Sequence, residues 1–128
     1  MHYLLIAFGG ALGSVVRYWL STVVDTRLNS GFPWGTLGVN VTGCLLIGLL
    51  ASLDAGDRLL GSAQTRFFLM TGLCGGYTTF SSFSLQTLSL MKEGNWHLAL
   101  TYVLGSVVLC LGAVWLGHAG AGWLHTAR

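Results

Sequence analysis

Four apolar segments make up nearly all of this chain, and they limit its possible folds more than any other feature. They cover about residues 3–24, 35–53, 67–91 and 96–117 of 128. A helix needs about 20 apolar residues to cross a bilayer, so each segment is long enough to cross once. The connections between them are short and hold the polar turn formers. The pattern predicts an all-α integral membrane protein with a single domain of four transmembrane helices.

Charged residues are scarce, which agrees with this fold class. They make up 8% of the chain, whereas soluble domains contain about 25%. The few lysines and arginines are scattered, with a net charge of +2, and form no basic patch of the kind that binds nucleic acid. We therefore expect membrane lipid, and no nucleic acid, among the partners.

The third segment is unlike a simple membrane-spanning helix. Its middle combines the pair Gly75-Gly76 with a run of Ser, Thr and Phe over residues 78–84. Glycine is a poor helix former, and Ser and Thr compete for backbone hydrogen bonds, so we expect a break near the glycine pair. Broken membrane helices hold ions through freed backbone groups. Gly72 and Gly76 also form a GxxxG pattern, which is typical of a close helix–helix contact. The spacing leaves both interpretations open.

The apolar segments contain hydrogen-bond donors but no carboxylate. All four acidic residues fall in the predicted connections, whereas proton-coupled transporters usually place an acid inside a span. Donors without acids suit an anion, although each donor could equally join two helices by a hydrogen bond. The donors are Asn40, Thr36, Thr78, Thr79, Ser81, Ser82, Ser84, Tyr102 and Ser106.

Two aromatic residues and one arginine are further candidates for an anion path. Phe80 and Phe83 are three residues apart, hence on one face of the helix after the break. The positive edge of an aromatic ring can face an anion, but such a pair is also typical of ordinary packing. Arg17 is the one cation placed within a segment. It is expected either to snorkel to the interface or to hold positive potential at a vestibule.

Neither an enzyme nor a side-chain metal cluster is indicated. Cys44, Cys74 and Cys110 lie in three different segments without CxxC spacing, so apolar packing is expected rather than a disulfide or a zinc site. No nucleophile–base pair is evident. No Gly-Lys pair occurs to suggest a nucleotide-binding loop.

The basic residues are nearly balanced between the two ends of a four-span chain. One end would carry Arg58, Arg66 and Arg128, and the other Arg27 and Lys92, with Arg17 if it reaches out. Short cytoplasmic loops normally carry an excess of Lys and Arg, so this balance fixes no orientation. It favours a chain that inserts both ways and pairs antiparallel, and a weak orientation signal is the simpler alternative.

Three stretches together resemble the CrcB/Fluc fluoride channel family. They are residues 9–18 (GGALGSVVRY), 35–43 (GTLGVNVTG) and 72–83 (GLCGGYTTFSSF). The resemblance covers essentially the whole chain, in order, and the second and third stretches are its most specific parts. It implies a passive, fluoride-selective channel in the bacterial inner membrane that exports fluoride. It also implies an antiparallel, dual-topology homodimer with two pores.

The resemblance further implies roles for individual residues. Asn40 would donate to fluoride, and the pore would be completed by Phe80, Phe83, Thr79, Ser81, Tyr102 and Ser106. The two phenylalanines would present ring edges, while Tyr102 and Ser106 would form a polar track beside them. Arg17 would stand near the aqueous entrance. A structural sodium ion, not transported, would be held at the break by the backbone carbonyls of Gly75 and Thr78.

One departure and two competing functions complete this interpretation. One and two turns after Ser106, the polar track would continue at Cys110 and Val114, neither of which is a good donor. A dual-topology exporter of the small multidrug-resistance type has the same size, span number and charge balance, but this chain lacks a glutamate in its first segment. A purely structural membrane subunit would have no use for a broken helix.

Overall fold

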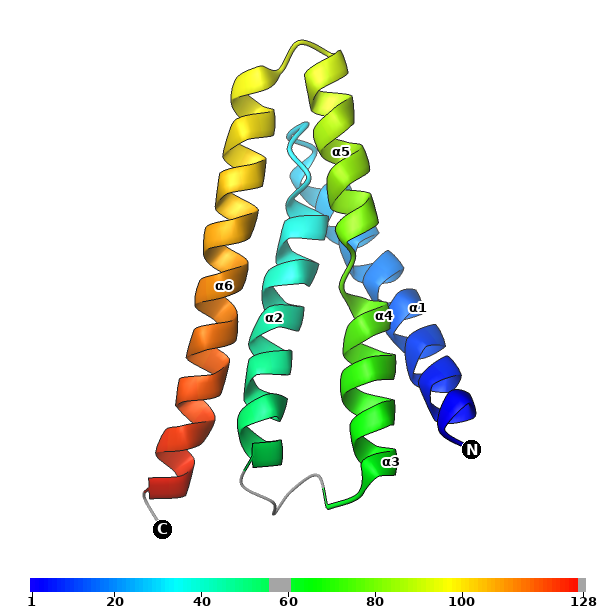
Figure 1. Cartoon of the computed structure of the whole chain (residues 1–128). Coiled ribbons are helices and arrows are strands. Elements are labelled where there is room, and N and C mark those ends of the chain that lie inside the picture. The colour runs from blue at the N-terminus through cyan, green and yellow to red at the C-terminus, as the bar shows by residue number, and fades with distance from the viewer. Residues whose placement is uncertain (56–60, 127–128) are drawn as a thin grey trace.

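The described part of the chain is helical throughout, as predicted. The structure, a computed structural model, describes residues 1–55 and 61–126, and no strand occurs within these ranges. Three helices are long and apolar enough to cross a membrane. They are α1 (His2–Leu28), α2 (Trp34–Ala55) and α6 (Trp96–Thr126). The start of α1 and the end of α6 lie at the same end of the bundle (Figure 1).

The remaining predicted segment is built from several short pieces. It consists of α3 (Ala63–Arg66), the π-helical stretch η1 (Phe67–Cys74), α4 (Gly75–Tyr77) and α5 (Phe80–Lys92). Together they run beside α2 from one end of the bundle to the other (Figure 1). Between α4 and α5, Thr78 and Thr79 have extended backbone, with φ −82° and −149°. The predicted broken helix is therefore present.

The break lies at Thr78 and Thr79, just after the glycine pair. Gly75 has helical dihedral angles, φ −64° and ψ −37°, and the glycine pair continues the helix through Tyr77. The helix ends because Thr78 and Thr79 leave the helical region. The break expected near the glycine pair thus lies two to three residues after it.

The glycines serve a close contact with α1 instead. A Cβ atom on Gly76 would overlap the carbonyl oxygen of Gly10, and one on Gly9 would lie 2.6 Å from the carbonyl oxygen of Phe68. Gly13 is buried against the backbone at Gly76 and Tyr77 in the same way. Small residues allow such backbone approach between membrane helices. The GxxxG interpretation is thus confirmed alongside the break.

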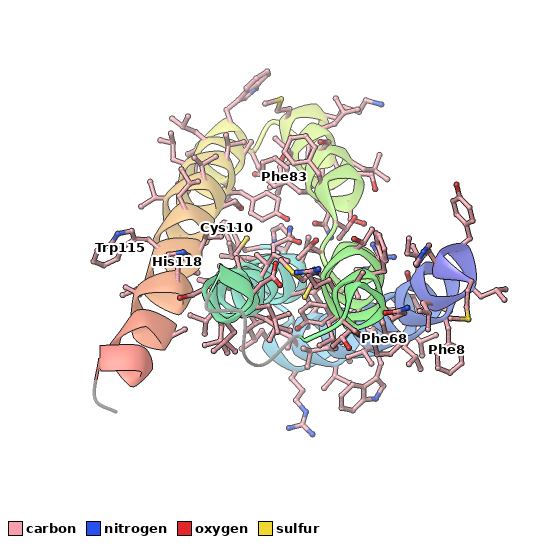
Figure 2. The ribbon with its side chains drawn as sticks, turned by 60° about the horizontal axis from the view of Figure 1, so that its bottom comes forward. Phe8, Phe68, Phe83, Cys110, Trp115 and His118 are labelled. Carbon is pink, nitrogen blue, oxygen red and sulfur yellow. The ribbon has the colours of Figure 1, made fainter. Side chains whose placement is uncertain are left out.

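Aromatic residues mark the inner and outer faces of the bundle. Phe8 of α1 stacks on Phe68 of η1 with ring centroids 6.3 Å apart. Trp115 projects outward from α6, whereas Phe83 points between α5 and α6 (Figure 2). Tyr102, whose side chain is fully buried, is packed with Phe83 and Leu37 in the core between α2, α5 and α6.

The long helices extend beyond the predicted segments because local capping sets their ends. α1 continues to Leu28, and its C-cap residue Asn29 donates its N–H to the Asp25 carbonyl at 2.9 Å. The left-handed φ of Asn29, 40°, then turns the chain out of the helix. Asp25 also accepts a 2.7 Å hydrogen bond from the Gly35 N–H through Oδ1. This carboxylate binds one of the backbone N–H groups that have no partner at a helix start.

One ion pair lies at the end of the bundle that carries the termini. The Arg66 guanidinium contacts the Asp54 carboxylate at 2.8 Å. Arg58 and Arg128, which enter the predicted charge balance at this end, lie outside the described residues.

Candidate functional site

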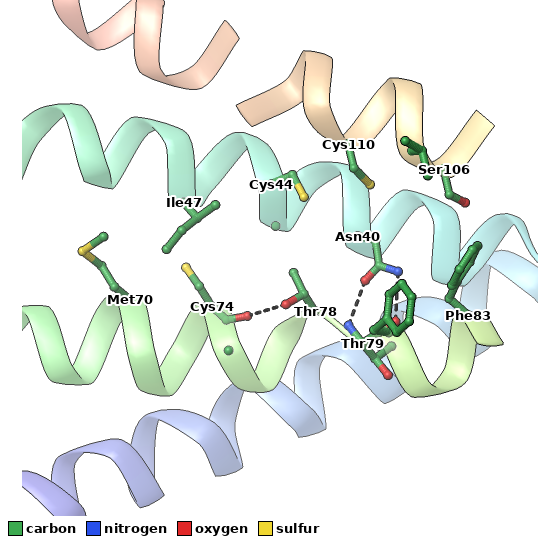
Figure 3. Close-up of a pocket in the computed structure, with 14 residues that line it drawn as sticks. Asn40, Cys44, Ile47, Met70, Cys74, Thr78, Thr79, Phe83, Ser106 and Cys110 are labelled. Carbon is green, nitrogen blue, oxygen red and sulfur yellow. Dashed lines mark hydrogen bonds between the residues drawn. The ribbon is translucent and has the colours of Figure 1, made fainter. Parts of the chain in front are cut away.

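A cavity of about 410 Å³ lies between α2, the broken segment and α6. Figure 3 shows side chains from all three entering it around the break. No charged side chain is among the described residues that line it. Its wall includes seven residues that the sequence analysis singled out for an anion path or an ion at the break: Asn40, Gly75, Thr78, Thr79, Phe80, Phe83 and Ser106.

Asn40 holds the broken backbone in place. Its Oδ1 accepts from the Thr79 N–H at 2.8 Å, and its Nδ2 donates to the Thr79 carbonyl at 3.1 Å. The two bonds satisfy both backbone groups of a residue that is 8% exposed. An amide nitrogen carries two protons, and only one is used here. The second N–H remains as a donor at the cavity wall.

The helix that begins after the break starts at the cavity. Thr79 is the N-cap of α5, and its Oγ1 accepts from the Ser82 N–H at 3.2 Å. The N-terminus of a helix carries partial positive charge. α5 has 13 residues, enough to develop this dipole, so its N-terminus contributes positive potential on its own side of the break.

Ser106 places an unpartnered hydroxyl at the cavity. Its residue is 7% exposed, and its Oγ has no hydrogen-bond partner among the described residues. A buried polar group without a partner costs about 1–3 kcal/mol. This side chain therefore has a donor without a partner among the described residues, on a residue that lines the cavity.

Three aromatic rings form a line beside the break. The centroids of Phe80 and Phe83 are 5.2 Å apart, and those of Phe83 and Tyr102 are 5.1 Å apart. The rings differ in exposure: Phe83 is 9% exposed, whereas Phe80 is 78% exposed. In the described chain, Phe80 thus lies at the open side of the cavity and Phe83 at the closed side.

Tyr102 does not line the cavity, although it was grouped with Ser106. Its hydroxyl donates to Gln86 Oε1 at 2.8 Å, so its proton is already engaged. Sequence reasoning did not single out Gln86. A signal was available, because Gln86 follows Phe83 by three residues on the same helix face and is the sole side-chain amide in α5.

Two backbone carbonyls at the break have lost their helical donors. In a continuous helix the Thr79 N–H would donate to the Gly75 carbonyl, but it donates to Asn40. Likewise the Ser82 N–H, the regular donor to the Thr78 carbonyl, donates to Thr79 Oγ1. The C-terminal end of a helix carries partial negative charge. These are the two carbonyls that the resemblance assigned to sodium.

Two other candidates lie away from the cavity. Ser81 is exposed, and its hydroxyl contacts Thr79 Oγ1 at 3.2 Å. Arg17 is half-buried on α1, forms no ion pair among the described residues and does not line the cavity. The structure of this chain thus gathers Asn40, Thr79, Phe83 and Ser106, but not Ser81 or Arg17.

Comparison with known proteins gives a consistent result. A family model described as CrcB-like protein, Camphor Resistance (CrcB), matches residues 4–118. A protein of Opitutus terrae named fluoride-specific ion channel FluC is 55% identical over 98% of this chain and 96% of its own. A protein of the same name from Rhodospirillum rubrum is 53% identical over 94% of this chain and 95% of its own. A third, from Paramagnetospirillum magneticum, is 52% identical over 93% of this chain and 94% of its own.

Proposed function

This chain belongs to the CrcB-like protein family, and from that membership and the cavity we propose that it is a fluoride-specific ion channel. Its several helices suited to crossing a bilayer make it a multi-pass membrane protein. The observation that carries the proposal is the buried hydroxyl of Ser106, a cavity-lining residue, which has no hydrogen-bond partner among the described residues. An anion would accept the hydrogen bond that this hydroxyl does not make within the described residues.

The cavity has the chemistry that fluoride requires. Fluoride is small and strongly hydrated, so a path must replace its water with closely spaced donors. The free N–H of Asn40, the hydroxyl of Ser106 and the N-terminus of α5 are such donors, and the edges of Phe80 and Phe83 add weak positive potential. No fixed cation is present in the described wall to trap the ion. Conduction needs binding that is strong enough to enter and weak enough to leave.

Transport is proposed to be passive and outward. None of the described residues that line the cavity is acidic, so no carboxylate is available there to couple anion movement to a proton. A passive path in the bacterial inner membrane lets fluoride leave whenever the electrochemical gradient favours exit. The same lack of a carboxylate disfavours an exporter of the small multidrug-resistance type.

Fluoride efflux from liposomes that contain only the purified protein tests this function. We expect fluoride release, measured with a fluoride electrode, that exceeds chloride release from matched vesicles by orders of magnitude. Release of both ions at similar rates would contradict fluoride specificity. No release, from protein shown to be folded, would contradict channel function.

We further propose an antiparallel homodimer with two pores. Polar and small residues of α2 and of the segments on either side of the break are exposed on the described chain: Gly38, Thr42, Gly75, Ser81 and Ser84. Phe80, a proposed pore residue, is also 78% exposed. Polar groups are costly in hydrocarbon, and a second copy would cover them. The near balance of basic residues supports insertion of the chain in both orientations.

Orientation can be tested with loop charges. Two added lysines beside Arg58 should bias insertion one way, and two beside Arg27 the other way. We expect each variant to be inactive alone and the coexpressed pair to restore fluoride resistance in a fluoride-sensitive host. A biased variant that is shown to insert one way only, yet conducts alone, would exclude antiparallel assembly.

A structural sodium ion is proposed at the break. The carbonyls of Gly75 and Thr78 have lost their helical donors, and they lie at the C-terminal end of the η1–α4 helix. Backbone oxygens are suitable ligands, because no group of three or more His, Cys, Asp or Glu able to bind a metal occurs in residues 1–55 and 61–126. Sodium would join the two copies and would not travel with fluoride. Isotopic sodium that moves in step with fluoride would contradict this role.

A further inference from the structure

Two cysteine thiols line the cavity one helical turn beyond the proposed fluoride donors Asn40 and Ser106. Cys44 of α2 follows Asn40 by one helical turn, and Cys110 of α6 follows Ser106 by one turn. Both cysteines line the cavity, one from each of two helices that pack against one another. Figure 3 shows both sulfur atoms in the space between α2 and α6. Residues far apart in the sequence therefore form one local site.

The helices that carry the thiols are held together just beyond them. One turn after the cysteines, a Cβ on Gly48 would overlap the carbonyl oxygen of Val114. A Cβ on Gly117 would likewise overlap the carbonyl oxygen of Leu45. α2 and α6 thus meet backbone to backbone, and neither can move away without losing this contact. The thiols are held as neighbours before any ligand arrives, which reduces the entropic cost of bridging them.

We propose that Cys44 and Cys110 form a binding site for soft, two-coordinate metal ions, and that an ion bound there blocks the anion path. Mercury(II) is the ligand for which the site is best suited. Each thiol loses its proton, two S–Hg bonds form, and two protons leave to water without any change of oxidation state. Thiolates are the ligands that soft metals prefer. The blocking step rests on the proposed channel function, whereas the binding step does not.

The thiol pair is a poor site for zinc, so the proposed ligands are metal ions that need only two sulfur ligands. Structural zinc takes four ligands in a tetrahedron, and the described residues contain no group of three or more His, Cys, Asp or Glu that could supply them. Cys74 also lines the cavity but comes from η1, and it is 3% exposed. Cys74 is thus a third thiol in the same cavity wall that is not a proposed ligand. Its substitution is the matched control for loss of a thiol outside the pair.

Titration calorimetry with mercury(II) tests the binding step. We expect one tight equivalent per wild-type chain. Cys44→Ser and Cys110→Ser should each weaken it by on the order of 100-fold or more, because a second thiol on the same scaffold acts at high effective concentration. Cys74→Ala should leave the affinity within roughly threefold, because the pair remains intact. Loss of the tight equivalent in Cys74→Ala, with both serine variants unaffected, would overturn the proposal.

Spectroscopy of the unmodified chain makes the test independent of the variants. X-ray absorption at the mercury edge should show two sulfur neighbours at one equivalent of metal. A single sulfur neighbour would contradict the paired site, whether or not the serine variants fold.

Fluoride efflux tests the blocking step, with every variant compared with its own rate in the absence of metal. We expect mercury(II) to stop efflux in wild type and Cys74→Ala, an added dithiol to restore it, and both serine variants to need far higher metal. Block of the serine variants at the wild-type concentration would overturn the proposal. A chain that binds mercury through the pair but shows no efflux without metal would contradict the channel function and leave the thiol site standing.

Discussion

Asn40 and Thr79 form a two-bond clamp in which one side-chain amide takes the place of helical backbone. Oδ1 accepts from the Thr79 N–H at 2.8 Å, and Nδ2 donates to the Thr79 carbonyl at 3.1 Å. The clamp joins α2 to the broken segment and leaves one amide proton free at the cavity. Asn40 is therefore both a structural residue and a proposed fluoride donor, and substitutions have to separate the two roles.

Asn40→Asp should abolish fluoride permeation. Aspartate retains Oδ1 for the Thr79 N–H but has no donor for the Thr79 carbonyl or for fluoride, and its charge repels the anion. The unsatisfied carbonyl should also lower the free energy of unfolding by about 1–3 kcal/mol. Liposome efflux measures the first effect, and denaturant unfolding measures the second. Asn29→Asp, in the exposed turn after α1, is the matched control, and efflux near the wild-type rate in Asn40→Asp would rule out contact with fluoride.

Ser106→Ala separates an anion donor from a structural hydroxyl. The Ser106 hydroxyl has no partner among the described residues, so its removal should leave stability unchanged or raise it. A hydrogen bond to a charged partner is worth about 1.5–3 kcal/mol, so flux should fall roughly ten- to hundredfold. Thr101→Val removes an exposed hydroxyl that bonds within α6 and should change neither quantity. A drop in stability with unchanged flux in Ser106→Ala would support a purely structural hydroxyl.

Phe80→Ile and Phe83→Ile should both reduce fluoride flux strongly, while their effects on stability differ. Isoleucine keeps apolar area but lacks the positive ring edge. Phe83 is buried against Tyr102, so its replacement should cost up to about 1.5 kcal/mol. Phe80 is mostly exposed in one chain and should cost less. Efflux and thermal unfolding measure the effects, with the exposed Phe8→Ile as control. Normal conduction in both variants would mean that the rings only pack.

Alanine substitutions at the neighbouring glycines Gly75 and Gly76 test different contacts. Gly76 packs within one chain, whereas Gly75 is proposed to face a second copy and sodium. A Cβ on Gly75 would meet only the Met70 carbonyl oxygen, at 4.0 Å, whereas one on Gly76 would overlap the backbone of Gly10. Gly76→Ala should therefore disrupt the packing of α1. Gly75→Ala fits a single chain and gains about 0.5–1 kcal/mol of helix propensity. If a partner and sodium cover this position, Gly75→Ala should instead weaken dimerisation and its dependence on sodium. A fully sodium-dependent dimer in Gly75→Ala would argue against a site there.

Hydropathy predicted the helical segments because length and apolarity decide which residues cross a bilayer. Hydropathy could not predict where the helices end, because the ends depend on contacts such as the hydrogen bond from the Gly35 N–H to the Asp25 carboxylate, ten residues away. The residue at which the helix breaks could not be predicted from the sequence for a similar reason. Gly76 stays helical because it packs on Gly10, and this contact outweighs its low propensity. The chain opens instead at Thr79, where Asn40, 39 residues away, supplies the hydrogen bonds.

Residue type predicted which residues belong to the candidate site better than it predicted which side chains contact one another. Asn40, Phe83 and Ser106 were singled out because donors and ring edges without acids suit an anion, and the structure brings them to one cavity. The hydrogen bond between Tyr102 and Gln86, and the presence of Cys44 and Cys110 in one cavity wall, depend on how helices pack. The spacing within one helix can draw attention to a residue such as Gln86, but it does not name the partner on another helix.

The glycine contact between α1 and the broken segment also has a consequence for how the protein is made. Ser14 donates to the Gly76 carbonyl across 62 positions of sequence, so α1 leaves the ribosome long before the surface it packs on. Until residue Gly76 has been synthesised, the glycine face of α1 has only lipid to contact. Helices in a bilayer insert first and associate afterwards. The direction in which α1 enters the membrane is therefore decided before this contact can form, and the contact cannot correct it later.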